Sequence, residues 1–221
     1  SGVGSLISGG GGNQSTATYS SVGGGVGNTA SGYRSTVSGG QNNTAYQYTY
    51  GFTTIGGGLN NTNVGDYSTI GGGSGNNVSN YESTISGGSA NIASSVASTV
   101  SGGSGNTASG GSSSIGGGIS HTASGNESTI GGGNYNQASG FKSTIGGGNS
   151  NIANQLRATV GGGEQNSASG YDASTVSGGL NNTASGNTST IGGGANNQAT
   201  NSNSFVGGGT GNIVSGSEST I

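Results

Sequence analysis

The chain has 221 residues, of which 55 are Gly, and only 4% are charged, with a net charge of −3. So weak and dispersed a charge argues against nucleic acid or an anionic membrane as a partner. The absence of Cys excludes disulfides and thiolate metal sites, and no apolar run approaches the roughly 20 residues that a bilayer-spanning helix needs.

Branched aliphatic residues recur at an almost constant interval, which argues against the disorder that composition alone would favour. Twelve of the fourteen gaps between these markers are 15 residues long, and the other two are 18 and 16. A short, regular period is typical of a solenoid, in which each repeat forms one turn of chain stacked on the next. The markers are Ile7, Val22, Val37, Ile55, Ile70, Ile85, Val100, Ile115, Ile130, Ile145, Val160, Val176, Ile191, Val206 and Ile221.

Each repeat predicts the same elements in chain order. A Ser-Thr-Ile strand comes first, as at residues 68–70, because β-branched residues fit a pleated surface. A Gly-Gly corner follows, as at Gly72 and Gly73, where the chain needs positive φ or two backbones approach closely. A return strand centred on Ala or Val completes the repeat, and this residue is small because the interior is narrow.

Asn stands six positions after the marker in thirteen of fourteen repeats. Asn tolerates the left-handed backbone region, and a stacked column can pass amide hydrogen bonds from turn to turn. We therefore predict a structural Asn column, formed by Asn13, Asn28, Asn43, Asn61, Asn76, Asn91, Asn106, Asn136, Asn151, Asn166, Asn182, Asn197 and Asn212.

His121, the only His, takes the place of Asn in the remaining repeat. We interpret it as a polar substitute in an otherwise uniform turn. The alternative is a layer of three His side chains near a trimer axis, holding a metal or an anion. No other metal site and no cofactor is predicted, because loose G-x-G-x-x-A matches at residues 25–30 and 103–108 are not followed by a helical pattern.

Both irregular gaps fall in the variable corner before the Ser-Thr strand, where a solenoid tolerates loops. The three extra residues lie within residues 46–52 and the single one near residues 171–173. Seven of the nine charged residues stand twelve positions after a marker, which indicates that this corner is exposed: Arg34, Glu82, Glu127, Lys142, Arg157, Asp172 and Glu218.

Aromatic residues also gather at or near this corner, as at Tyr19, Tyr33 and Tyr67. One interpretation is that they cover the thin core or seal contacts between chains, and the other is that they bind a ligand, since Tyr is favoured at interfaces. If one segment binds a partner, the predicted surface is the insertion, with Tyr46, Tyr48, Tyr50 and Phe52.

These patterns predict an all-β fold: a parallel β-solenoid or β-roll of about fourteen 15-residue turns, formed by a single repeat array over residues 1–221. Each turn offers little more than one Ile or Val and one Ala to bury, so we expect packing between chains, as a parallel homotrimer or a fibre. No polar capping repeat is visible at either end, which predicts that the array is a segment of a longer one.

The run A-S-G-F-K-S-T-I-G-G-G at residues 138–148 recurs in variants along the chain. It resembles the head repeats of trimeric autotransporter adhesins of the YadA type, and is similar to repeats of phage-tail-fibre-like and other bacterial surface proteins. The resemblance implies a left-handed parallel β-roll, a homotrimer, surface display and adhesion. The family repeat is usually one residue shorter and often has Ala where this chain has Thr. No neck, coiled-coil stalk or membrane anchor is visible.

We therefore expect an extracellular or cell-surface structural and adhesive fibre segment, which associates with itself and binds a host-surface or matrix component. Separated carboxylates, a single His and the lack of a nucleophile elbow argue against an enzyme. Two alternatives stay open. One is a filament whose copies stack end to end without a dedicated ligand, and the other is an ice-binding solenoid, because a Thr ladder at about 4.8 Å spacing could order water.

Overall fold

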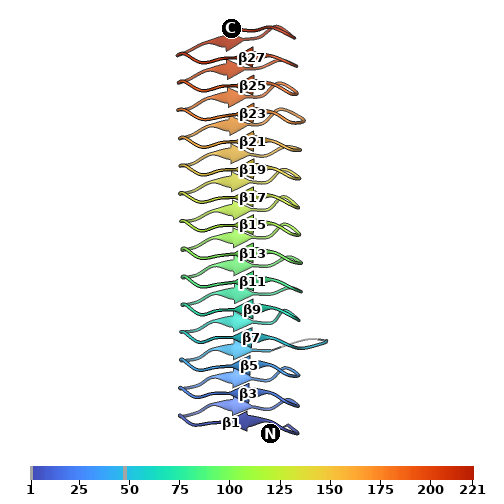
Figure 1. Ribbon diagram of the computed structural model, residues 1–221, viewed down its shortest axis with the longest axis vertical. Helices are drawn as coiled ribbons and strands as arrows, with labels where there is room; N and C mark the ends of the chain where they lie inside the picture. The colour runs from blue at the N-terminus through green and yellow to red at the C-terminus, as the bar shows by residue number, and fades with distance from the viewer. Residues whose placement is uncertain (1, 47–48) are drawn as a thin grey trace. The chain divides into compact units, whose positions relative to one another are not determined.

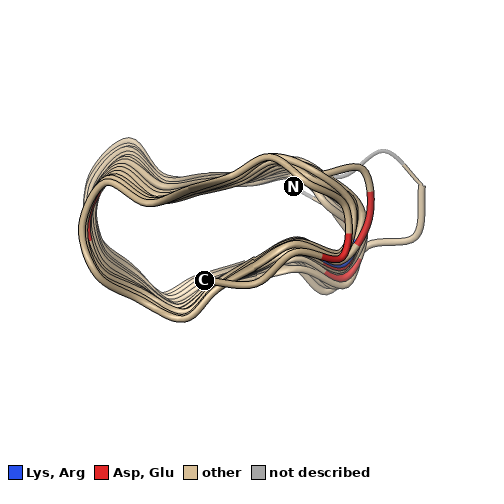
Figure 2. Cartoon of the chain, turned by 90° about the horizontal axis from the view of Figure 1, so that it is seen from above, with Lys and Arg blue, Asp and Glu red and all other residues tan. Residues whose placement is uncertain are grey.

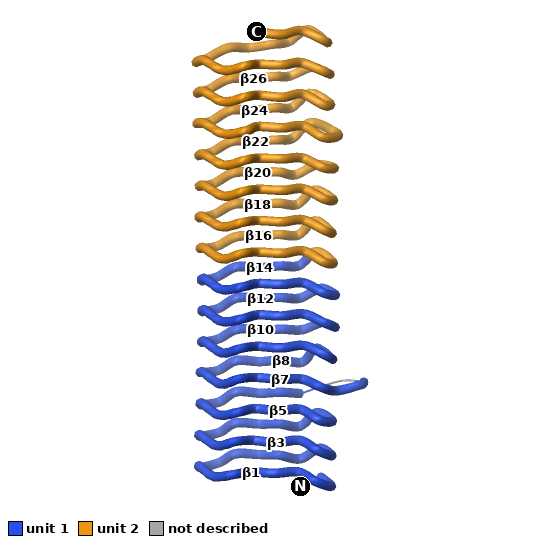
Figure 3. The backbone as a smooth tube through the Cα atoms, viewed as in Figure 1, with its two compact units in different colours: residues 1–109 blue, residues 110–221 orange. Residues whose placement is uncertain are grey.

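The computed structural model describes residues 2–46 and 49–221, and it confirms the predicted all-β parallel solenoid of about fourteen turns. The described residues contain no helix. Each turn contributes one strand of two residues to each of two parallel sheets (Figure 1). The chain divides into two compact units, residues 1–109 and 110–221, which Figure 3 colours blue and orange.

The described part of unit 1 contributes seven strands to each sheet. The first sheet has the order β1 (Leu6–Ile7), β3 (Ser21–Val22), β5 (Thr36–Val37), β7 (Thr54–Ile55), β9 (Thr69–Ile70), β11 (Thr84–Ile85) and β13 (Thr99–Val100). The second has the order β2 (Gln14–Ser15), β4 (Thr29–Ala30), β6 (Thr44–Ala45), β8 (Thr62–Asn63), β10 (Asn77–Val78), β12 (Ile92–Ala93) and β14 (Thr107–Ala108).

Unit 2, all of whose residues are described, likewise contributes seven strands to each sheet. The first sheet has the order β15 (Ser114–Ile115), β17 (Thr129–Ile130), β19 (Thr144–Ile145), β21 (Thr159–Val160), β23 (Thr175–Val176), β25 (Thr190–Ile191) and β27 (Phe205–Val206). The second has the order β16 (Thr122–Ala123), β18 (Gln137–Ala138), β20 (Ile152–Ala153), β22 (Ser167–Ala168), β24 (Thr183–Ala184), β26 (Gln198–Ala199) and β28 (Ile213–Val214).

The strands pair in the register of the repeat, so that like residues stack. Thr84 lies opposite Thr69 in the pairing of β11 with β9, and the markers beside them are aligned in the same way. Neither irregular gap shifts this register, because Val37 pairs with Ile55 and Val160 with Val176. The extra residues therefore lie between β6 and β7 and between β22 and β23, at the corner that the sequence predicted.

The interior of the turns is filled by four columns of buried side chains: the aliphatic markers, the Ala or Val residues of the second sheet, the Ser residues that precede the first-sheet strands, and the Asn residues. Every marker from Val22 to Val206 is completely buried, and the Ala or Val column of the second sheet packs beside it. The sequence left open which side chains of the Ser-Thr-Ile strand face inward. Ser83 and Ile85 are buried while Thr84 between them is partly exposed, so Thr faces outward and Ser inward.

Two buried polar residues, Ser15 and Asn63, stand in the Ala column of unit 1. Asn63 is completely buried, and its amide donates to the carbonyl of Thr54 at 3.1 Å. Its Oδ1 accepts from the hydroxyl of Ser68 and from the backbone N–H of Gly65. Its polar atoms are thus paired inside the turn, which removes most of the cost of burying an amide.

Candidate interaction surfaces

Within each unit, the Asn column joins each turn to the next through backbone groups. Nδ2 of Asn76 donates to the carbonyl of Gly72 in its own corner at 2.9 Å and to that of Gly88 in the next turn at 3.0 Å. Its Oδ1 accepts the backbone N–H of Asn91, the next column member, at 3.0 Å. The column is therefore a set of buried clamps for the Gly corner rather than a binding site.

The predicted amide-to-amide bonds exist at some pairs, such as Asn61 to Asn43 at 3.1 Å, but backbone groups are the main partners. The corner itself requires glycine. Gly73 has φ +94°, and a Cβ there would lie 2.1 Å from the carbonyl oxygen of Gly88. A side chain at this position would separate the turns and displace the Asn clamp.

His121 reproduces the Asn geometry with an imidazole. The ring is completely buried, and its Nδ1 accepts the backbone N–H of Asn136 at 3.1 Å. Burial lowers the pKa of His121, while backbone hydrogen bonds with Gly133 and Asn136 act in the opposite direction. The ring therefore lies inside the turn and accepts the same backbone N–H that the Asn residues of the column accept in other turns.

The outward face of the first sheet carries a hydroxyl ladder. In unit 1 it runs through Thr36, Thr54, Thr69, Thr84 and Thr99, each paired with its neighbour along the sheet. All five side chains are partly or fully exposed. The corresponding positions of the second sheet are mixed, with Thr, Gln, Asn and Ile, so the regular ladder belongs to one sheet only.

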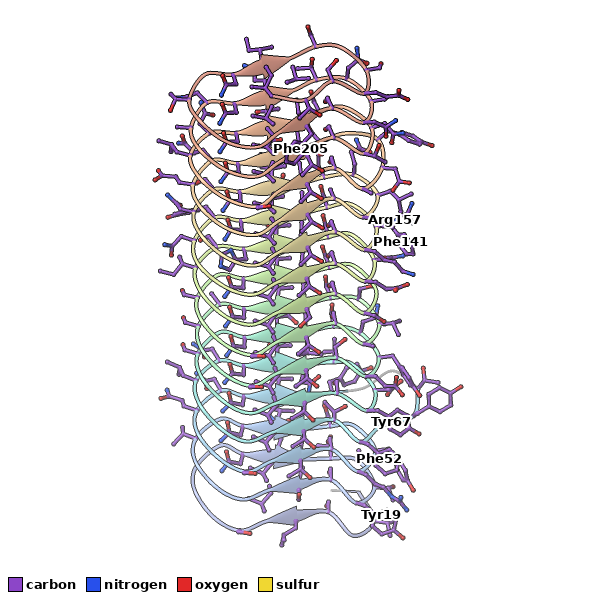
Figure 4. All side chains as sticks on the ribbon, turned by 45° about the horizontal axis from the view of Figure 1, so that its top comes forward. Tyr19, Phe52, Tyr67, Phe141, Arg157 and Phe205 are labelled. Carbon is purple, nitrogen blue, oxygen red and sulfur yellow. The ribbon has the colours of Figure 1, made fainter. Side chains whose placement is uncertain are left out.

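A row of touching aromatic rings lies at the variable corner of unit 1. We call it the aromatic row, and it consists of Tyr19, Tyr33, Phe52, Tyr67 and Tyr81. Centroids of successive rings are 6.2, 6.2, 5.1 and 5.4 Å apart. Tyr19, Phe52 and Tyr67 are labelled in Figure 4, where they project on the same side of the turns. Phe52 and Tyr67 are nearly parallel, at 13°, and their rings are stacked.

Arg34 makes cation–π contacts with three rings of the aromatic row. Its guanidinium lies 5.7, 5.0 and 5.2 Å from the ring centroids of Tyr19, Tyr33 and Phe52. Such contacts stabilise an exposed cation by about 0.5–1 kcal/mol each. The order of the rings follows the stacking of turns, because the N–H of Phe52 donates to the carbonyl of Tyr33 and that of Tyr67 to Gly51.

The structure brings part of the predicted insertion surface into this row. The ring of Tyr50 lies 6.5 Å from that of Tyr67, and Asp66 accepts the backbone N–H groups of Tyr50 and Gly51. Phe52 is a member of the row itself. Tyr46 is exposed beside the end of β6, and Tyr48 lies outside the described residues. The sequence predicts the grouping of the corner aromatic residues, but it gives no sign of the cation–π contacts that Arg34 makes with them.

The same corner in unit 2 carries charges. Lys142 pairs with Glu127 at 3.5 Å, and Arg157 binds Asp172 through both carboxylate oxygens. The hydrogen bond with Arg157 lowers the pKa of Asp172. In Figure 2, which is viewed down the stack of turns, each turn is an elongated loop, and the charged segments lie mainly at one end of it. One detail differs from the predicted charged column: Ala173 occupies the corner position, and Asp172 is aligned with Leu156 instead.

We find no pocket among the described residues, and no group of three or more His, Asp or Glu side chains in them that could bind a metal ion. Within residues 2–46 and 49–221, no helix has the length and apolarity to cross a membrane. No model of a known protein family matches the chain, and a search of curated proteins finds no match.

Proposed function

We propose that the chain is a structural and adhesive segment of an extracellular or cell-surface fibre. The observation that carries the proposal is the repetition of outward side chains from turn to turn, as in the stacked hydroxyls of Thr69, Thr84 and Thr99. A surface that repeats with every turn offers many equal contacts. Such contacts favour multivalent attachment to a host-surface or matrix component over capture of one small ligand.

The buried clamps support a mechanical role. Within each unit, each turn is bonded to the next through two sheets and through the Asn column, and the markers from Val22 to Val206 are buried inside the turns. A solenoid held together in this way transmits load from one turn to its neighbours through parallel hydrogen bonds. The proposal assigns the chain no catalytic role.

Parallel association into a homotrimer is part of the proposal. The core of a single chain is already covered, and we propose that exposed aliphatic side chains drive the association. Leu59 and Ile92 in unit 1 are 40% and 37% exposed, and Ile119 and Leu180 in unit 2 are 47% and 44% exposed. They lie on the second sheet or on the turn that leads into it. Rotational symmetry would bury each of these side chains against its counterparts in the other chains.

Sedimentation equilibrium of the full chain tests the association. We expect a mass of three times the 20.6 kDa of one chain. The double variant Leu59→Thr/Leu180→Thr should shift the equilibrium toward monomer, while Thr69→Ser/Thr144→Ser on the first sheet leaves it unchanged. A monomer at every concentration would overturn the trimer.

Adhesion is tested with beads coated with the full chain and presented to a matrix-coated surface. The expected result is retention that rises steeply with coating density, because many weak contacts act together. Beads coated with an unrelated protein of similar charge serve as the control. Equal retention of both kinds of bead would contradict the adhesive role.

Ice binding is a second candidate, favoured by the outward orientation of the Thr ladder. Its spacing of about 4.8 Å is that of neighbouring strands. Thermal hysteresis and ice-crystal shaping test it, with Thr84→Tyr/Thr144→Tyr on the ladder compared with Thr62→Tyr/Thr122→Tyr on the second sheet. Ice binding predicts loss of activity in the first pair only. Unshaped ice with the unmodified chain would exclude it.

A further inference from the structure

We infer that alternating apolar and polar layers align the chains of the proposed homotrimer, and that side chains of unit 2 form these layers. The inference rests on the proposed function, because it needs three parallel copies of this chain around one axis. It deepens that proposal by naming the side chains that decide which turns of neighbouring chains meet.

Two columns of outward side chains carry the inference. The leading column stands in the turn that enters each strand of the second sheet, and parallel bridges join its members from turn to turn. Its residues are Ile119, Asn134, Asn149, Glu164, Leu180, Ala195 and Thr210. The strand column consists of the outward residues of the even-numbered strands from β16 to β28, which are Thr122, Gln137, Ile152, Ser167, Thr183, Gln198 and Ile213.

Large aliphatic side chains occupy every second turn of this surface. Ile119 and Leu180 stand in the leading column, whereas Ile152 and Ile213 stand in the strand column. Between each of them and the next lies one turn whose two column positions carry no apolar side chain larger than Ala. The four side chains are between 37% and 59% exposed, and successive ones are about 9.6 Å apart along the stack.

The turns between the aliphatic residues carry mainly hydrogen-bonding groups. They contribute Asn134 with Gln137, Glu164 with Ser167, and Ala195 with Gln198. Glu164 is the only charged residue of the two columns. Depletion of charge among exposed aliphatic side chains is typical of the centre of a protein–protein interface, which favours another protein chain as the occupant of this surface.

Rotational symmetry makes the layers. Rotation about an axis along the stack leaves each turn at its own height, so the same turn of three copies meets at one level. Because only two residues separate the columns in every turn, the leading column of one copy adjoins the strand column of the next. The carboxylate of Glu164 can then accept a hydrogen bond from the Ser167 hydroxyl of the next copy, and the amide of Asn134 can pair with that of Gln137.

The polar layers discriminate between alignments of the chains. A neighbour shifted by one turn would set aliphatic levels against polar levels and bury polar groups without partners. A shift of two turns would match Ile119 with Ile152 and Leu180 with Ile213, but this staggered contact does not close around a rotation axis and leads to an open filament. In coiled coils, polar side chains within an apolar contact likewise fix the alignment at some cost in affinity.

Replacing one polar layer tests its role by sedimentation velocity of the full chain. Glu164→Leu/Ser167→Leu joins two apolar levels, so we expect about tenfold tighter association and species larger than the trimer, because shifted alignments lose their penalty. Glu164→Gln keeps hydrogen-bonding groups at this level and should leave the trimer as the largest species. Thr129→Leu/Thr144→Leu adds the same two side chains to the first sheet and should change neither property. Equal effects of the two Leu pairs would contradict the inference.

Cross-linking tests the alignment directly, and the lack of native Cys makes every introduced thiol unique. Asn134→Cys chains mixed with Gln137→Cys chains should form disulfide-linked pairs, because the two thiols lie at one level. Asn134→Cys mixed with Ser167→Cys is the matched control. Ser167 stands in the same column as Gln137 but two turns further on, and about 9.6 Å is beyond the reach of a disulfide.

Preferential linkage of Asn134→Cys to Ser167→Cys would show the two-turn stagger and overturn the inference. Equal linkage of both pairs, or no linkage in a chain that sediments as a trimer, would also overturn it and leave the homotrimer standing. Failure of the homotrimer itself has a different signature: the unmodified chain is then a monomer at every concentration, and the inference falls with it.

Discussion

Two adjacent glycines that look alike in the sequence have different structural roles. A Cβ at Gly87 would meet no atom within 4 Å, whereas one at Gly88 would lie 2.2 Å from the carbonyl oxygen of Gly103 and 2.7 Å from Nδ2 of Asn91. Gly88 also has φ +89°, which L side chains rarely adopt. Only the second glycine of each pair is therefore required by contact with the following turn.

Gly88→Ala should lower the free energy of unfolding by about 3 kcal/mol or more, because it combines backbone strain with a clash against rigid backbone. Gly87→Ala is the matched control and should change it by about 1 kcal/mol at most. Urea unfolding followed by circular dichroism measures both values. Similar losses for the two variants would contradict the assignment of the close contact to Gly88.

His121 should give the chain a pH-dependent stability. Burial lowers the pKa of the folded imidazole, whereas the unfolded chain is protonated below about pH 6.5. The unfolded state then binds more protons, so the free energy of unfolding is constant above about pH 6.5 and falls as the pH drops toward the folded pKa. His121→Asn should remove this part of the pH dependence. Urea unfolding from about pH 5 to 8 measures the free energy of unfolding of both chains. The two chains have the same carboxylates, so the difference between their free energies isolates the contribution of His121.

Strands of only two residues are the repeating element of this fold, and each contributes one inward and one outward side chain. Such short strands are stable because stacking pairs them on both sides within a unit, as β17 pairs β15 and β19. The inward residue supplies the apolar burial, and the outward one is free to vary. The mixed outward positions of the second sheet illustrate this freedom.

The two residues of β17 should therefore respond differently to truncation. Ile130→Ala removes a completely buried side chain and should cost about 2–4 kcal/mol. Thr129→Ala, on the exposed side of the same strand, should change the free energy of unfolding by about 0.5 kcal/mol at most. A comparable loss from Thr129→Ala would show that the outward ladder supports the fold.

At the scale of the whole molecule, the period of the markers was enough to predict the parallel stacking, the register and the position of both irregular gaps. The sequence could not show that Ser faces inward, because Ser and Thr have similar polarity and alternate in the same strand. It also could not order the aromatic row. Tyr33 and Phe52 are far apart in sequence, and they touch only because the insertion leaves the register of the turns intact.

Deletion of one complete repeat tests the modularity of the array. Removal of residues 131–145 joins Ile130 to Gly146 and preserves every column, so we expect a cooperative fold with an unchanged sheet spectrum. Removal of residues 132–145 leaves one additional Gly in the tight corner, where the Asn clamp has no room for it. Loss of cooperativity in the second chain only is the expected result, measured by the m-value of urea unfolding.

The left-handed corner has a consequence for how such a chain can diversify. Tyr67, Lys142, Ala97 and Thr188 all adopt φ between +52° and +56° there, so the hydrogen bonds of the turns, and not the identity of the side chain, set this conformation. Each turn therefore presents one side chain at this corner, whatever its chemical type. Side chains at this position can differ from turn to turn, at intervals of about 4.8 Å, without any change in the buried columns.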